Sequence, residues 1–238
     1  MRFALLALSS LLIVSACGGG DAKPDAAAHD AAADATNDAG KCGSDVQLVG
    51  EFVDWDSSDS QFCGIFQATW QVHNDPTRVI HTAPNGRIQL CLARSSSTQI
   101  DITQPTDPSQ CSQPAATYTL PGIAIVSQAV IATGATYSAR SFTTSEIRAL
   151  GVTIDPNKGQ VFVHVDGSPR AVTITSLDSD TLAFDGATWT HGNTGVNVFF
   201  ANVDLTANST AIQIPNAVGT GAVPLSAGTI TYTTVHAN

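Results

Sequence analysis

The chain has few charged side chains, and basic ones are the scarcest. Asp, Glu, Lys and Arg make up 13% of the residues, with 10 Lys and Arg against 20 Asp and Glu and a formal net charge of -10. The basic residues form no cluster along the sequence. Because nucleic-acid binding depends on neutralising phosphates with Lys and Arg, this balance argues against a nucleic-acid partner.

Long hydrophobic runs and catalytic motifs are also missing. After residue 16 no apolar stretch is long enough to cross a bilayer. There is no His-Glu-x-x-His, no Gly-x-Ser-x-Gly and no P-loop. The histidines have no spacing typical of a metal or catalytic site, so we expect them to be polar surface residues; they include His73, His81, His164, His191 and His236.

What the chain does have, at its start, is the pattern of an export signal. Met1 and Arg2 precede an apolar run, residues 3–14, which is too short to span a membrane as a mature helix. Val14-Ser15-Ala16-Cys17 then resembles the lipobox of bacterial lipoproteins. That resemblance implies removal of residues 1–16 and lipidation of Cys17, with enough acyl chains for firm anchoring. An ordinary signal cut near Ala16, which would leave a free thiol, is the alternative.

Residues 17–41 follow as a segment of low complexity. Gly and Ala dominate it, and single Asp residues punctuate it every four or five positions. It has almost no large apolar side chain to bury, so ordering it would cost backbone entropy with nothing to offset the cost. We expect a disordered linker, with an Ala-rich helix as the alternative. Gly18 follows Cys17 where lipoproteins of the inner membrane carry Asp, which implies sorting to the outer membrane.

Four cysteines remain after Cys17, an even number in a compartment that oxidises thiols. We expect two disulfides among residues 42–111, which hold all four; the candidates are Cys42, Cys63, Cys91 and Cys111. Three connectivities are open, and spacing does not choose among them. Zinc binding needs paired short spacings such as Cys-x-x-Cys, which the chain lacks.

Strand patterns begin immediately after the linker. Apolar and polar residues alternate over residues 46–53 and 88–92, and residues 64–72 suggest another strand. Pro84-Asn85-Gly86 is a turn signal before the strand at 88–92. Thr, Ser, Ala, Val, Ile and Gly dominate the composition, which is typical of an exported β protein.

Three of these segments resemble the transthyretin-like or carboxypeptidase-regulatory-like modules of bacterial surface proteins. The matching stretches are Gly50-Glu51-Phe52-Val53, Gln67-Ala68-Thr69-Trp70 and Thr82-Ala83-Pro84-Asn85-Gly86-Arg87-Ile88-Gln89-Leu90. Gln67 stands where the family has Gly, and Ala83 or Pro84 where it has Asp. The resemblance implies a β-sandwich (transthyretin-like or Ig-like) and no catalysis.

The second half repeats the β signals after a short helix. Thr143-Thr144-Ser145-Glu146 is a capping box that predicts a helix over residues 145–150, ended by Gly151. Residues 160–165 and several later segments predict further strands. We therefore expect a mainly β fold with one or two antiparallel sandwich modules. The expected domains are a first module at 42–111, a connecting segment with the helix at 112–157, and a second module at 158–238 that could be continuous with the first.

Two clusters are candidate binding sites. Asp54, Asp56 and Asp59 offer closely spaced carboxylate oxygens of the kind that Ca²⁺ requires. The glycine and the distal Glu of an EF-hand are missing, and a solvated acidic turn is the alternative. Trp55 and Trp189 lie next to polar loops and could form an aromatic platform for a sugar. Trp70, inside an apolar strand pattern, is expected in the core.

We therefore expect a non-catalytic lipoprotein of the cell envelope, anchored in the outer membrane by its N-terminal lipid. Its β-sandwich would serve a structural role or bind a protein or a polysaccharide, with Ca²⁺ as the one cofactor considered. The alternative is an exported hydrolase or other enzyme on the same scaffold. That alternative requires His164, His191 and an acidic residue to converge in one pocket.

Overall fold

Alternating apolar and β-branched residues form strands along most of the chain. The computed structural model describes residues 42–58, 61–94, 97–105, 118 and 120–237, which belong to one compact unit. These residues form a mainly β structure with two short helices, α1 (Gln128–Ile131) and α2 (Thr144–Ala149). Among them no helix is long and apolar enough to cross a membrane. The expected signal peptide and linker, residues 1–41, lie outside the described residues.

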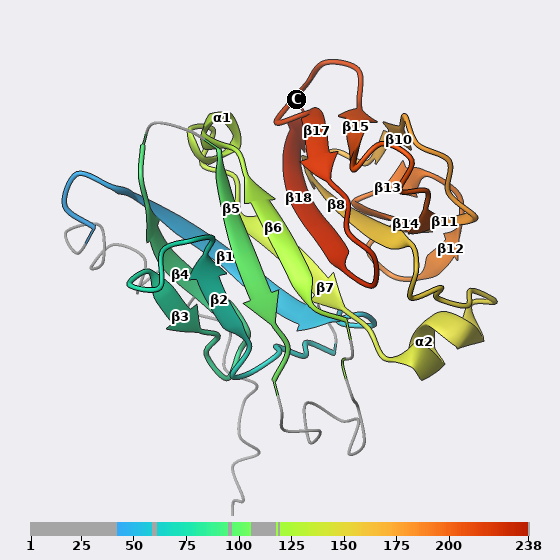
Figure 1. Cartoon of the computed structure of the whole chain (residues 1–238), viewed down its shortest axis with the longest axis horizontal. Helices are drawn as coiled ribbons and strands as arrows, with labels where there is room; N and C mark the ends of the chain where they lie inside the picture. The colour runs from blue at the N-terminus through green and yellow to red at the C-terminus, as the bar shows by residue number, and fades with distance from the viewer. Residues whose placement is uncertain (1–41, 59–60, 95–96, 106–117, 119, 238) are drawn as a thin grey trace, which may run out of the picture. The chain divides into compact units, whose positions relative to one another are not determined.

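A ten-stranded sheet runs through the whole unit (Figure 1). Its strands, in spatial order, are β12 (Trp189–His191), β11 (Asp180–Phe184), β14 (Asn197–Val203), β8 (Gly159–Gly167), β18 (Ile230–Ala237), β6 (Gly122–Val126), β5 (Thr98–Thr103), β2 (Thr69–Val72) and β3 (Val79–His81), and β16 (Ala217–Val218) also pairs with β18. Of the three segments expected directly after the linker, only residues 64–72 contribute to this sheet, through β2; the other two belong to a smaller sheet.

Three smaller sheets accompany it. One has the order β4 (Arg87–Leu92), β1 (Val46–Asp54), β7 (Tyr137–Ser141), and a second has the order β10 (Thr173–Ile174), β15 (Ser209–Gln213), β17 (Gly221–Pro224). The third joins β13 (Thr194–Gly195) to β9 (Arg170–Ala171). The expectation of purely antiparallel sheets is wrong, because β18 runs parallel to both β8 and β6, and β1 runs parallel to β7.

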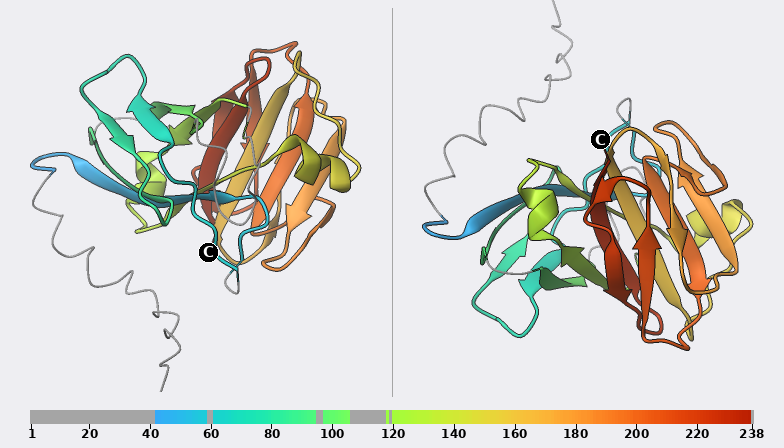
Figure 2. Two further views of the ribbon diagram at one scale, coloured as in Figure 1. Left: turned by 90° about the horizontal axis from the view of Figure 1, so that it is seen from below. Right: turned by 90° about the horizontal axis from the view of Figure 1, so that it is seen from above.

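Two hydrophobic cores lie on opposite faces of the ten-stranded sheet. Figure 2 shows the strands of this sheet from two opposite directions. One core joins that sheet to β1, β4 and β7 and contains Phe52, Ile88, Phe162 and Tyr232. The other joins it to β15 and β17. The strands β8, β14 and β18 are therefore buried on both faces, which explains why β8 is buried almost throughout rather than half-buried.

The helix α2 begins as its sequence predicts. The Thr143 hydroxyl accepts the backbone N–H of Glu146, and the Glu146 carboxylate accepts the backbone N–H of Thr143, so the capping box is complete. After the helix, Gly151 adopts a φ of 84°, the left-handed conformation that glycine permits at a helix end.

The expected strand at residues 64–72 is only half formed. Gln67 has a φ of 65°, which interrupts an extended chain, and the strand begins at Thr69. The turn before β4 is present, with Gly86 at a φ of 71° and its N–H donating to the Ala83 carbonyl at 2.7 Å. In β4 the residues alternate between half-buried and buried, as predicted.

Candidate functional site

Trp55 and Trp189 lie together in the core and not on the surface. Their rings stack with centroids 3.7 Å apart and planes inclined by 6°. Trp55 is fully buried and Trp189 is 8% exposed, so the expectation of an exposed aromatic platform is wrong. Both rings also contact Phe162, which shows that the pair is part of the hydrophobic core. Trp70 is buried in the core, as expected.

The Asp54 carboxylate is used inside the protein. It is 4% exposed, and its two oxygens accept the hydroxyl of Tyr118 and the backbone N–H of Asp56. Asp59, the third candidate calcium ligand, lies outside the described residues. Within the part of the chain that is described, no group of three His, Cys, Asp or Glu residues is placed to hold a metal ion.

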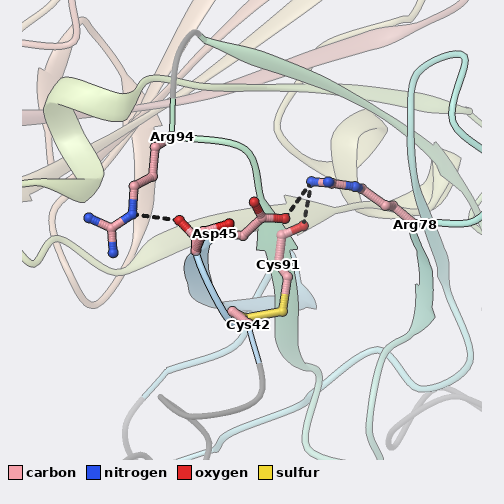
Figure 3. Close-up of a disulfide and its surroundings, with 6 residues drawn as sticks. Cys42, Asp45, Arg78, Cys91 and Arg94 are labelled. Carbon is pink, nitrogen blue, oxygen red and sulfur yellow. Dashed lines mark hydrogen bonds and ion pairs between the residues drawn. A yellow bond between two sulfur atoms is a disulfide. The ribbon is translucent and has the colours of Figure 1, made fainter.

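Cys42 and Cys91 form a disulfide that joins the first described residue to β4 (Figure 3). Arg78 reinforces this end of the sheet, since its guanidinium lies 2.9 Å from the Asp45 carboxylate and donates to the Cys91 carbonyl. Cys63 is also disulfide-bonded. Cys17 and Cys111 lie outside the described residues.

A polar cavity of about 200 Å³ lies where β1 and β7 meet β8 and β14. We call it the Arg140 pocket, and its polar lining consists of Glu51, Ser57, Ser138, Arg140, His164 and Asn197, with Ser58 beside Ser57. Apolar lining comes from Val53, Val196 and Phe184, and Phe62, 40% exposed, also lines it. The described lining thus combines one carboxylate, one guanidinium and several neutral hydrogen-bonding groups.

Parallel pairing of β1 with β7 sets one side of the pocket. Glu51 lies opposite Ser138 and Val53 lies opposite Arg140, so the alternation of a strand places all four on one face of this sheet. The Ser138 hydroxyl donates to the Glu51 carboxylate at 3.1 Å. This bond fixes one carboxylate oxygen of Glu51 beside the cavity.

Arg140 is the structural centre of the pocket. Its Nη1 donates to the carbonyls of Ser57 at 2.6 Å and Trp55 at 2.9 Å, and more weakly to that of Asp54 at 3.4 Å. Its guanidinium carbon lies 4.5 Å from the centre of the Phe184 ring, a cation–π contact. Residues 54–57 form a turn, which we call the 54–57 turn, and Arg140 holds it against the pocket.

His164 and Asn197 form the opposite side, on the neighbouring strands β8 and β14. They are directly paired in the sheet, and the His164 Nδ1 lies 2.8 Å from the Asn197 amide oxygen. Because that oxygen accepts, Nδ1 carries the hydrogen and Nε2 of the neutral ring is an acceptor. Desolvation by burial lowers the pKa of His164 below 6.5, more than the Asn197 hydrogen bond and the Glu51 charge raise it. The ring is therefore neutral at pH 7.

His191 is not part of this pocket. It lies on β12, where its Nδ1 is 2.9 Å from an Asp180 carboxylate oxygen and its side chain is 62% exposed. That hydrogen bond and the Asp180 charge raise the pKa of His191. His164, His191 and an acidic residue thus do not converge, although His164 does share a cavity with Glu51.

No protein family matches the chain, and no curated protein matches it. Among solved structures it is similar to the Bacillus anthracis TIE protein, at 13% identity and a TM-score of 0.24. The match covers 82% of this chain and 34% of the other, so this chain spans about a third of that protein's length. A TM-score this low carries no argument about fold or function.

Most of the pocket could not be selected from the sequence. Glu51, Ser138, Arg140 and Asn197 lie on three strands that are far apart in the chain, β1, β7 and β14, and no catalytic or binding motif links them. The sequence gives Arg140 only as a single charge within Tyr137-Ser138-Ala139-Arg140-Ser141; the structure shows that this whole strand is buried, where an arginine requires specific partners.

Proposed function

We propose that the chain is a lipid-anchored protein of the bacterial cell envelope that binds a small, uncharged, hydroxylated ligand in the Arg140 pocket without transforming it. A single sugar unit of an envelope polysaccharide has this chemistry. The anchor is supported by the lipobox-like Val14-Ser15-Ala16-Cys17 at the end of an apolar leader. Outer-membrane sorting is part of the proposal, because Gly18 follows Cys17.

The observation that carries the binding proposal is the charge balance of the pocket lining among the residues that the structure describes. Glu51 and Arg140 carry opposite charges, and His164 is neutral at pH 7 because burial lowers its pKa. A ligand without net charge matches this lining, while its hydroxyl groups can both donate to the Glu51 carboxylate and accept from neighbouring donors. The exposed ring of Phe62 adds an apolar surface for a sugar face.

The size of the cavity sets the size of the ligand. At about 200 Å³ it is smaller than pockets for drug-sized molecules, which run from about 300 to 1,000 Å³. One sugar ring therefore suits it better than an oligosaccharide enclosed at full length. A longer polysaccharide would bind through one terminal or branching unit.

Calorimetry on the full chain in detergent, with a panel of neutral monosaccharides and envelope polysaccharides, tests this proposal. We expect saturable binding that weakens at least about tenfold, or about 1.4 kcal/mol, in Glu51→Gln and in His164→Gln. His73→Gln is the matched control, since His73 is exposed and pairs with Asp101 outside the pocket. Absence of binding across the panel, or equal binding in all variants, would overturn it.

The anchor has its own test. Mass spectrometry of the protein from a bacterial membrane fraction is expected to show an acylated N-terminal cysteine at position 17. Cys17→Ser should abolish acylation and release the chain from the membrane pellet. A wild-type chain that starts elsewhere, or that carries an unmodified Cys17 thiol, would contradict the lipoprotein proposal.

One observation favours the alternative of an exported hydrolase. The pocket brings the Glu51 carboxylate and the neutral His164 imidazole into one cavity, and these are groups that perform acid–base chemistry. NMR spectra of the bound saccharide, followed over hours, separate the two functions. New reducing ends that depend on both Glu51 and His164 would establish catalysis, and an unchanged saccharide supports binding alone.

A further inference from the structure

The 54–57 turn borders the Arg140 pocket, and its two carboxylates act on the charge of Glu146 in α2. On the pocket side, Ser57 lines the cavity and Arg140 binds the carbonyls of the turn. Within the turn, the Ser57 hydroxyl accepts the backbone N–H of Cys63, which ties the turn to the chain that follows. Movement of the turn would therefore change the pocket wall and the contacts of Arg140.

Three acidic groups come from the turn itself and from α2. Asp54 ends β1, Asp56 lies in the turn, and Glu146 lies in the first turn of α2. The Tyr118 hydroxyl donates to Asp54, and the Tyr118 backbone forms an isolated β-bridge with Thr143, the residue that caps α2. Tyr118 thus joins the 54–57 turn to the start of α2.

Glu146 is poorly satisfied as an ion in this position. One carboxylate oxygen accepts the Thr143 N–H, whereas Oε1 is buried and has no hydrogen-bond partner among the described residues. An ionised carboxylate with a buried, unpartnered oxygen is costly, and a protonated one is much less so. The pKa of Glu146 is raised to about 7, mainly by desolvation and less by the charges of Asp54 and Asp56, although the two hydrogen bonds with Thr143 lower it.

The charged groups near Glu146 are two carboxylates, those of Asp54 and Asp56, and two arginines, Arg140 and Arg148. Desolvation and the Asp54 charge raise the pKa of Asp56, while Arg140 lowers it. Arg148, in the last turn of α2, is the basic residue on the helix itself. Ionisation of Glu146 therefore places another negative charge beside Asp54 and Asp56.

We propose that Glu146 is a pH sensor that holds the 54–57 turn closed against Arg140 when its carboxyl is protonated and loosens the turn when it is ionised. Through the turn it controls ligand affinity at the Arg140 pocket, a step that rests on the proposed binding function. Because the pKa of Glu146 is raised in the closed form, this form holds the Glu146 proton more tightly than the open form does. Opening then releases it, so the closed form is favoured at low pH and is lost as the pH rises through 7.

The turn contains its own reporter, because Trp55 lies in it and stacks on Trp189. Near-ultraviolet circular dichroism of the full chain, titrated from about pH 5.5 to about pH 8.5, should show a transition near pH 7. Glu146→Gln should abolish the transition, since glutamine also serves in a capping box but carries no charge. Asp56→Asn should move the midpoint to lower pH, because the Asp56 charge raises the pKa of Glu146.

Ligand binding gives the second arm of the experiment. With the saccharide found by calorimetry, affinity should fall about fivefold to tenfold between about pH 6 and about pH 8 in the wild type and stay constant in Glu146→Gln. A flat wild-type tryptophan signal, or a transition retained in Glu146→Gln, overturns the sensor. A tryptophan transition without any saccharide binding would sink the proposed function and leave the sensor of the turn standing.

Discussion

The indole of Trp189 lies flat on the indole of Trp55 and at the same time donates its Nε1–H to the Trp55 carbonyl at 3.0 Å. The Trp55 carbonyl also accepts from Arg140 at 2.9 Å. Two side chains from distant parts of the sequence thus fix the backbone of one turn residue. The turn that borders the Arg140 pocket is positioned by the hydrophobic core as well as by Arg140.

Removal of the Trp189 ring should therefore destabilise the protein strongly. We expect Trp189→Ala to lower the free energy of unfolding by about 3–5 kcal/mol through lost burial and packing. Trp189→Phe should lower it less, because it keeps an aromatic ring and loses mainly the hydrogen bond to Trp55. Denaturation followed by far-ultraviolet circular dichroism measures both. Leu177→Ala, at a side chain that is 78% exposed, is the neutral control; equal effects at both sites would contradict the buried stack.

The Cys42–Cys91 disulfide should contribute to stability by restricting the unfolded chain. It closes a loop with a sequence separation of 49 residues. Removal of a bridge of this kind costs about 2–4 kcal/mol, so we expect a Cys42→Ser/Cys91→Ser double variant to unfold at lower denaturant concentration by that amount. The measurement is made without reductant, because Cys63 is also disulfide-bonded. An unchanged midpoint would show that the bridge adds nothing to stability.

Gly64 should tolerate no side chain. A Cβ atom at this position would overlap the backbone of Asn85 and Gly86 in the turn before β4. Because neither peptide can move without displacing β4, we expect Gly64→Ala to lower the free energy of unfolding by about 3 kcal/mol. Gly134→Ala is the control: its φ is 79° and nothing lies near the added atom, so it should cost about 1–2 kcal/mol in backbone strain. Thermal unfolding of the two variants compares them, and similar losses would refute a steric cause at Gly64.

The features that the sequence predicted well are local ones. The capping box of Thr143 and Glu146 spans four residues and depends on contacts within one turn. The alternation in β4 and the turn at Gly86 are equally local. Each of these features depends only on the backbone conformation that its own residues favour. A few neighbouring residues of the sequence are therefore enough to predict it.

The features that the sequence did not predict depend on which distant strands lie together. The parallel pairing of β18 with β8 and β6 joins residues far apart in the chain, and no local signal marks it. β7 contains Ser138, Arg140 and Ser141, yet every residue in it is buried. Trp55 lies beside polar residues in the sequence, but a partner 134 residues away covers it. The Arg140 pocket combines both difficulties, since buried polar residues from several strands form it.

The pKa values of His164 and His191 should lie on opposite sides of 6.5, the ordinary pKa of histidine. Burial lowers the pKa of His164, whereas the hydrogen bond to Asp180 raises that of His191. In the folded protein His164 resists protonation, so its contribution destabilises the fold as the pH falls below 6.5. His191 has the opposite sign: its contribution is present below 6.5 and disappears as the pH rises through its own raised pKa.

NMR titration of the imidazole ring signals distinguishes these two groups. We expect the His191 midpoint to lie above that of His164 and to move down toward 6.5 in Asp180→Asn, because the variant lacks the carboxylate charge. The His164 midpoint should stay unchanged in that variant, since Asp180 is not among the groups that shift it. A His164 ring that titrates above 6.5 would mean that the pocket side of β8 is solvated, and a neutral imidazole could then no longer be part of the ligand chemistry proposed for the Arg140 pocket.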